Sequence, residues 1–179
     1  MQLYAIDDLV AALGELGPVL QPVRVANALR GVRIDERTLR PYLTWAPTRY
    51  TRNLVIRSDA FELIAICWDG GARSPIHDHA DSECAFVLQR GSITCENYRA
   101  ALRDRDAGYD LQRTSARALA EGEIDMRSGH LSIHRVGAYD GRAVTLHVYA
   151  KPIDACRAFE EDGSFRIVAS HYDSLPAAR

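Results

Sequence analysis

Two histidines separated by one residue, His77-Asp78-His79, are the residues in this sequence whose types and spacing first suggest chemistry. On a β-strand, residues i and i+2 point to the same face, and their side chains start roughly 6.6 Å apart. That separation lets two imidazole rings converge on one metal ion at about 2.1 Å each. The same pair would also suit the solvent-facing side of a strand, so the spacing alone leaves both interpretations open.

The residues around this pair favour the metal-binding interpretation. Gly71 precedes His77, and Cys84 and Gly91 follow His79, in the pattern G-x5-H-x-H-x4-C-x6-G. The two glycines fall where turns are expected at the ends of strands. The pattern therefore predicts a metal site on short strands joined by tight turns.

A third metal ligand must come from elsewhere in the chain. His130 and His134 lie four residues apart on an expected strand, so they share a face and both remain candidates. Three neutral imidazoles would leave half of an octahedral Fe(II) shell open, as in sites related to the facial triad of two histidines and one carboxylate. Such a site has open positions for further ligands.

Thr145, His147 and Tyr149 alternate along another expected strand and therefore face one side. A hydroxyl, an imidazole and a phenol in one row predict a hydrogen-bond relay that fixes the imidazole tautomer and orients the phenol.

Any arginine of this chain could bind a carboxylate, because a planar guanidinium can donate two parallel hydrogen bonds. Arg52 is the candidate because its segment, Tyr50-Thr51-Arg52-Asn53, resembles a known substrate-binding segment. Tyr50 shares the strand face of Arg52 and could add a hydroxyl contact. Arginine is common in this chain, so a surface position for Arg52 is the alternative. Trp45 and His171 are expected only in packing or at the surface.

Five segments of the chain, in order, resemble the cysteine dioxygenases, a branch of the cupin β-barrel family. In cupins, two histidines of an H-x-H motif and a later histidine hold the metal, and a residue soon after the motif, usually glutamate, is a fourth ligand. Cysteine in that last position, as at Cys84, is characteristic of the dioxygenase branch. The resembling segments are residues 50–55, 67–68 with 74–84, 133–136, 145–149 and 154–159.

The resemblance implies one Fe(II) per chain, held by His77, His79 and His134, and so favours His134 over His130. It implies that both atoms of dioxygen are added to the sulfur of L-cysteine, which gives cysteine sulfinic acid. It also implies a thioether bond between Cys84 and Tyr149. The other residues to which it gives catalytic or substrate-binding positions are Thr145, His147, Arg52, Tyr50, Trp68 and Cys156.

Other functions remain as alternatives. The same chemistry could act on another small thiol acid such as 3-mercaptopropionate, although that branch of the family usually carries glutamine near Arg52. A cupin isomerase or decarboxylase would use Mn, Zn or Ni, with Glu83 as the fourth ligand. A cupin that only binds or senses a ligand is a third alternative. Thr145 and Ala138 depart from the family, which commonly has serine and asparagine there.

These residues must be positioned by a mainly β fold. Apolar periodicity and turn residues predict helices over 9–16, 23–29 and 35–43, and so a helical layer over residues 1–45. Short β-rich runs separated by glycine and aspartate then follow over residues 50–172. We expect one cupin domain over residues 1–179, a jelly-roll β-barrel against which the N-terminal helices pack. Residues 104–108 are expected at a hairpin tip.

The chain has 179 residues and a net charge of −2, with 22 basic and 24 acidic residues. This balance provides no basic field for a nucleic acid. No segment approaches the ~18 apolar residues of a membrane span, and the first residues lack the layout of a signal peptide. The four cysteines have no C-x-x-C spacing and are expected as free thiols. We therefore expect a cytoplasmic protein, and we expect it to be a monomer. The resemblance implies that its partners are a small thiol and dioxygen.

Overall fold

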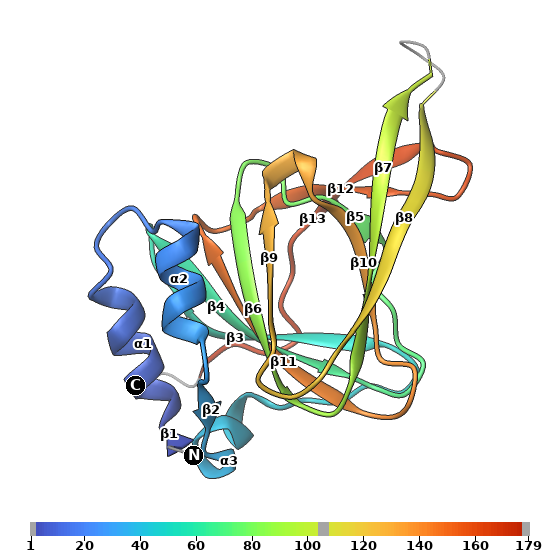
Figure 1. Ribbon diagram of the computed structural model, residues 1–179. Coiled ribbons are helices and arrows are strands. Elements are labelled where there is room, and N and C mark those ends of the chain that lie inside the picture. Colours follow the sequence, from blue (N-terminus) through green and yellow to red (C-terminus); the bar gives the residue numbers. More distant parts are fainter. Residues whose placement is uncertain (1–2, 104–107, 177–179) are drawn as a thin grey trace.

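The computed structural model describes residues 3–103 and 108–176 and shows a β-barrel with a helical layer on one side (Figure 1). The layer consists of α1 (Ile6–Gly14), α2 (Pro22–Leu29), α3 (Glu36–Leu39) and a 3-10 turn, Arg40–Tyr42. Two short strands, β1 (Leu3–Tyr4) and β2 (Arg33–Ile34), pair in parallel between these helices. The expectation of helix throughout this region is wrong at β2, because a two-residue strand is too short to leave a periodic signal.

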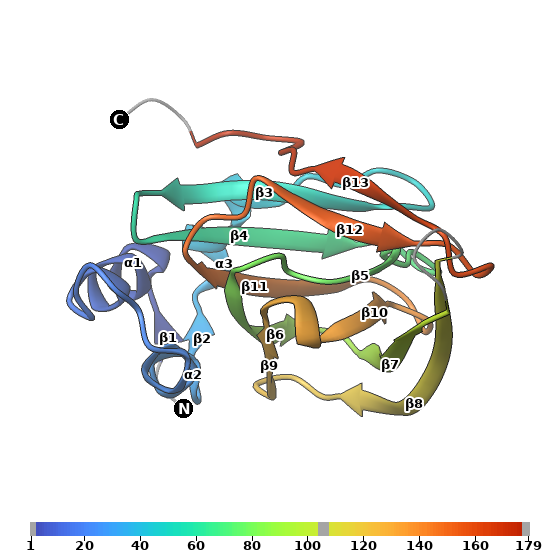
Figure 2. The same ribbon diagram turned by 90° about the horizontal axis from the view of Figure 1, so that it is seen from above.

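The barrel is made of two antiparallel sheets, seen from above in Figure 2. The five-stranded sheet has the order β3 (Tyr50–Arg57), β4 (Phe61–Trp68), β11 (Ala143–Ala150), β6 (Glu83–Arg90), β9 (Ile124–Ser128). The six-stranded sheet has the order β13 (Phe165–Ala169), β12 (Ala155–Phe159), β5 (Ile76–His77), β10 (Ile133–Gly137), β7 (Ile93–Leu102), β8 (Tyr109–Leu119). The mainly β, jelly-roll expectation is confirmed.

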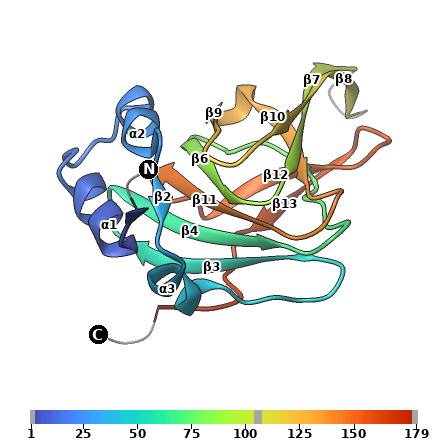
Figure 3. The ribbon, with the colours of Figure 1, turned by 60° about the horizontal axis from the view of Figure 1, so that its bottom comes forward.

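The central strands of the five-stranded sheet, β4, β11 and β6, are buried on both faces, which explains the continuous apolar run of β4. Its Leu63 and Ala65 pack with Leu13 and Leu29 of the helical layer. Its alternate residues, such as Ile64, face the barrel interior. Figure 3 shows the helices along the outer side of this sheet. Burying one leucine contributes roughly 1.5–3 kcal/mol, so the helical layer holds the sheet in place.

Gly91 shows why a glycine is required at the turn between β6 and β7. Its φ is +84°, a left-handed conformation that glycine adopts without cost. A Cβ at this position would lie 2.4 Å from the carbonyl oxygen of Arg142. Any other residue would therefore push this turn away from β11, the strand that carries Thr145, His147 and Tyr149.

The chemistry-bearing segments differ from their expected lengths in an informative way. The strand predicted around the histidine pair ends at His77, and His79 lies beyond it. The tip expected at 104–108 falls largely outside the described residues.

Among the described residues, no helix has the length and apolar character to cross a bilayer. The single-domain boundaries remain a prediction.

Candidate metal centre and active site

Three histidines meet inside the barrel, and their ligand atoms all lie within 4.8 Å of one another. His77 ends β5 and is the cross-strand partner of His134 on β10, while His79 reaches the same point from the loop after β5. The Nε2 atoms of His79 and His134 are 3.2 Å apart. We call His77, His79 and His134 the three-His group.

The three-His group suits a metal ion. Two nitrogen ligands at right angles, each about 2.1 Å from an ion, would be about 3 Å apart, close to the Nε2 separation of His79 and His134. Burial lowers the pKa of His77 to about 4 and the pKa values of His79 and His134 well below 6.5. All three rings are therefore neutral at pH 7, the form in which imidazole binds metals.

Asp78, between the two histidines, points away from them and is completely buried. Its carboxylate accepts hydrogen bonds from the backbone N–H of Arg157 at 3.0 Å and from that residue's Nε at 2.5 Å. The Nδ1 of His130 lies 2.8 Å away, and the backbone N–H of Ala80 donates at 3.2 Å. Although burial acts to raise the pKa of Asp78, the hydrogen bonds lower it overall. Asp78 is thus a charged anchor for the loop that carries the ligands.

These contacts also settle the position of His130. It lies in a 3-10 turn, Gly129–Leu131, before β10, so it does not share a strand with His134. It binds Asp78 and lies outside the three-His group. The parity argument that kept it as a candidate ligand fails because the strand starts after it. Asp78 and Arg157 were not singled out from the sequence, where buried ion pairs leave no periodic signal.

Thr145, His147 and Tyr149 lie on β11 and face the barrel interior, as the alternation predicts. The indole N–H of Trp68 donates to the Thr145 hydroxyl at 2.9 Å. That hydroxyl lies 2.9 Å from the Nε2 of His147. With Trp68 as donor, the hydroxyl is free to donate to Nε2, which leaves the ring proton of His147 on Nδ1.

Cys84 and Tyr149 are directly opposite each other on the paired strands β6 and β11. The Sγ of Cys84 lies 3.9 Å from the Nδ1 of His147. Burial raises the pKa values of the Cys84 thiol and of the Tyr149 phenol, the latter despite the nearby guanidinium of Arg52. Both side chains are therefore protonated at neutral pH when neither a metal ion nor a substrate is bound nearby.

Glu83 lies on the other side of β6 from Cys84. Cys84 belongs to the interior cluster with Phe86 and Leu88. The Glu83 carboxylate accepts a hydrogen bond from the hydroxyl of Ser128 at 2.8 Å. Glu83 is not part of the three-His group, so the geometry does not favour a four-ligand site.

A pocket opens beside the three-His group. Arg52 reaches it from β3, and its guanidinium carbon lies 5.7 Å from the centre of the Tyr149 ring. Tyr50 packs against Trp68 at 5.0 Å between ring centres. The backbone carbonyl of His171, expected only at the surface, accepts a hydrogen bond from Arg52 at 3.1 Å. The residues that line the pocket include Tyr50, Arg52, His77, Tyr149, Cys156 and His171.

Comparison with known structures supports the fold. A Klebsiella pneumoniae protein with a double-stranded β-helix domain superposes with a TM-score of 0.52 and 10% identity, covering 74% of this chain and 88% of that one. A Thermus thermophilus protein superposes with a TM-score of 0.50 and 18% identity, covering 63% of this chain and 93% of that one. The barrel is therefore a cupin-type double-stranded β-helix.

Comparison of sequences identifies the family. A family model described as cysteine dioxygenase type I matches residues 21–162. Cysteine dioxygenase type 1 of Rattus norvegicus is 32% identical over 161 residues, which cover 86% of this chain and 78% of the rat protein. That of Homo sapiens is 30% identical over 159 residues, with the same two coverages. Because the family model spans well over half of the 179 residues, this chain belongs to the cysteine dioxygenase type I family of cupin thiol dioxygenases.

Proposed function

We propose that the protein is an Fe(II)-dependent dioxygenase that converts L-cysteine and dioxygen to cysteine sulfinic acid. The observation that carries the proposal is a buried group of three neutral imidazoles beside a pocket arginine, in a chain of the cysteine dioxygenase family. A neutral ligand set suits an anionic thiolate substrate, and the arginine suits a carboxylate. Cysteine carries both groups.

Three histidines, His77, His79 and His134, would hold the iron. When bound there, Fe(II) supplies open coordination positions and the redox chemistry that lets dioxygen react with a thiol. The overall reaction is balanced without a further reductant, because one thiol and one dioxygen molecule give one sulfinic acid. No nicotinamide or flavin is needed.

Arg52 would bind the substrate carboxylate. A guanidinium has five N–H donors, and Arg52 uses its Nε on the carbonyl of His171 and one donor of a terminal nitrogen on the hydroxyl of Ser170. The remaining donors can make the paired hydrogen bonds that a carboxylate accepts. Tyr50 lines the same pocket and would add its hydroxyl, and Cys156 would form part of the wall.

The row on β11 would orient the reacting groups. Trp68 and Thr145 hold His147 in one tautomer. His147 in turn lies between Phe86, on which it stacks at 4.5 Å, and Tyr149 at 6.2 Å between ring centres. Tyr149 is buried beside His79, so its phenol would exclude water from the thiol during oxidation.

We also propose a thioether bond between Cys84 and Tyr149. Directly opposed residues on antiparallel strands have Cβ atoms about 4.5–5.5 Å apart, which brings the sulfur near the phenol ring. Formation of the bond joins Sγ to a ring carbon with loss of two hydrogens, and dioxygen accepts the two electrons and two protons.

The function is tested with protein loaded anaerobically with Fe(II). We expect cysteine-dependent oxygen uptake with one sulfinic acid formed per dioxygen, and none with Zn(II)-loaded protein. Absence of thiol-dependent uptake by the Fe(II) form would overturn the proposal. Comparison of kcat/KM for L-cysteine and 3-mercaptopropionate identifies the preferred thiol.

The crosslink is tested by intact mass after turnover. We expect a species lighter by two hydrogens that survives thiol reduction and is missing in Cys84→Ser. A difference that disappears on reduction would indicate a disulfide instead.

We also propose that the protein is a cytoplasmic monomer made of one domain. Native mass measurement tests whether it is a monomer.

A further inference from the structure

The chain after β13 returns to the pocket and runs beside β3, at the edge of the five-stranded sheet (Figure 2). We call residues Ser170–Ser174 the C-terminal segment. The backbone N–H of Leu54 donates to the carbonyl of Ser174 at 3.0 Å, and the N–H of Asp173 donates to the carbonyl of Arg52 at 2.7 Å. The segment therefore extends the sheet by a short parallel bridge next to Arg52.

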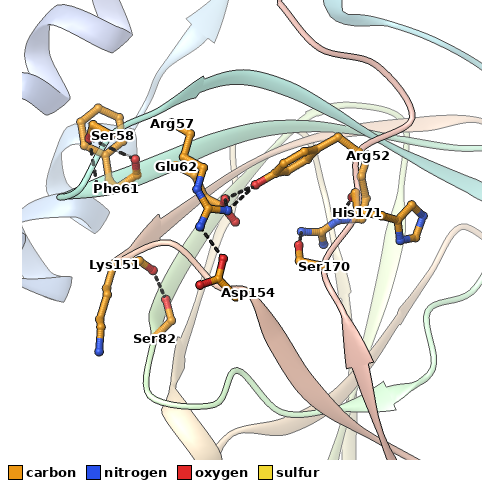
Figure 4. Close-up of polar contacts among 11 residues, drawn as sticks. Arg52, Arg57, Ser58, Phe61, Glu62, Ser82, Lys151, Asp154, Ser170 and His171 are labelled. Carbon is orange, nitrogen blue, oxygen red and sulfur yellow. Dashed lines mark hydrogen bonds and ion pairs between the residues drawn. The ribbon is translucent and has the colours of Figure 1, made fainter.

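The C-terminal segment contacts Arg52 through both its backbone and its side chain. The Asp173 carboxylate accepts the backbone N–H of Arg52 at 2.8 Å and pairs with Arg49 at 2.8 Å. The guanidinium donates from Nε to the carbonyl of His171 at 3.1 Å and to the Ser170 hydroxyl at 3.0 Å. Figure 4 shows the guanidinium directed at Ser170. The C-terminal segment thus makes two hydrogen bonds to a guanidinium that also lies near the ring of Tyr149.

A second group of residues fixes the C-terminal segment. The hydroxyl of Tyr172 donates to the carboxylate of Glu62, which is completely buried, and accepts from Arg57 at 2.8 Å. Arg57 also pairs with Asp154 at 2.5 Å, an arrangement visible in Figure 4. Glu62 is the cross-strand partner of Tyr149. The hydroxyl of Tyr172 is therefore anchored on Glu62, next to the row on β11. Its neighbours in the chain, His171 and Asp173, both contact Arg52.

We propose that the C-terminal segment positions Arg52 for the substrate carboxylate, with Ser170 and Tyr172 as positioning residues. The inference rests on the proposed function. A free arginine side chain has many rotamers, and a guanidinium already held by two hydrogen bonds loses less rotamer entropy when substrate binds. The segment would thus contribute to recognition of the carboxylate without touching the thiol or the metal.

The test compares two thiols on Fe(II)-loaded enzyme: L-cysteine, and cysteamine, which has the same thiol and amine but no carboxylate. For Ser170→Ala we expect the KM for cysteine to rise about fivefold, the usual effect of one hydrogen bond, and the KM for cysteamine and both kcat values to stay unchanged. Ser92→Ala, an exposed serine in the turn between β6 and β7, is the matched control.

Tyr172→Phe tests the anchor in the same assay. It removes the hydroxyl that binds Glu62 and Arg57, so we expect a selective rise in the KM for cysteine. Tyr139→Phe, at an exposed tyrosine that contacts Arg73, is its control. Thermal melting checks that each variant is folded. If Tyr172→Phe is unfolded, Ser170→Ala alone tests whether the C-terminal segment positions Arg52.

Two kinds of outcome would overturn the inference. If Ser170→Ala changes neither KM, or raises both by the same factor, the C-terminal segment does not position Arg52, and the proposed function stands. If the wild-type enzyme consumes no oxygen with any thiol, the proposed function fails and this inference fails with it.

Discussion

The two polar groups inside the barrel are positioned in different ways. Thr145, His147 and Tyr149 lie on an eight-residue strand that is paired on both sides. His77 and His79 lie on a two-residue strand and the loop that follows it. The first group is placed by strand register, since alternate residues face one side of a sheet. The second group is placed by short backbone pairings of His77 and His79 together with the buried side chain of Asp78.

This difference indicates where each group is vulnerable. A paired strand holds its side chains through many backbone hydrogen bonds, so loss of one side chain leaves its neighbours in place. The loop carrying His79 has fewer backbone hydrogen bonds, to Gly129 and Ser82, and it also depends on the Asp78 carboxylate. That carboxylate has four hydrogen-bonding contacts with three residues. We therefore expect substitutions near the metal ligands to affect metal binding, and substitutions on β11 to affect turnover with the metal retained.

The largest expected effect separates the three metal ligands, including His134 on β10, from the row on β11. His134→Ala removes one of three ligands and should abolish retention of stoichiometric Fe(II) and all thiol-dependent oxygen uptake. His147→Gln, on β11, should retain the metal and lose turnover. Metal analysis after gel filtration measures the first difference and an oxygen electrode the second. Equal metal content in the two variants would contradict the assignment of the three-His group.

Asp78→Asn should have the next largest effect. The amide keeps the size of the side chain but removes the charge that pairs with Arg157 and lies against the ring of His130. Residues that support metal ligands typically account for about 10–100-fold in metal affinity, and we expect a loss of that order here. Competition with a chelator measures it. Asp81→Asn, at an exposed aspartate paired with Lys151, is the matched control and should bind metal as the wild type does.

The same difference explains what the sequence could predict. Strand β4 lies among the short β-rich runs expected over residues 50–172, because a long apolar run between turn residues is a strong local signal. The row on β11 follows from simple alternation. The three-His group needed the family resemblance, because spacing alone left His130 and His134 equal.

Contacts between distant segments could not be predicted in this way. Asp78 binds Arg157, 79 residues further on, and Arg52 binds His171 through a backbone carbonyl. A backbone carbonyl has no sequence signature, so nothing in the residue type of His171 pointed to it. The pairing of β5 with β12 brings Asp78 and Arg157 together, and β5 is too short to be recognised from periodicity.

Thr145→Val should have a smaller effect than either metal-site substitution. It removes the hydroxyl that accepts from Trp68 and contacts His147, leaving a buried indole N–H without its partner. An unsatisfied buried donor costs about 1–3 kcal/mol, so we expect a loss of stability of that order in urea unfolding and a reduced kcat with unchanged metal content. Thr145→Ser keeps the hydroxyl and should restore kcat. If the valine variant has the kcat of the wild type, the hydroxyl does not orient His147.

Glu83→Gln should have the smallest effect, and it tests strand register itself. Glu83 and Cys84 are neighbours on β6 and point to opposite faces, with the Glu83 carboxylate on Ser128. Substitution of a side chain away from the core usually changes stability by no more than about 0.5 kcal/mol. We expect unchanged metal content and kcat, whereas Cys84→Ser on the inner face removes the crosslinked species. A tenfold loss of metal affinity in Glu83→Gln would mean that this carboxylate reaches the metal, and that the register of β6 does not decide which of the two neighbours faces the site.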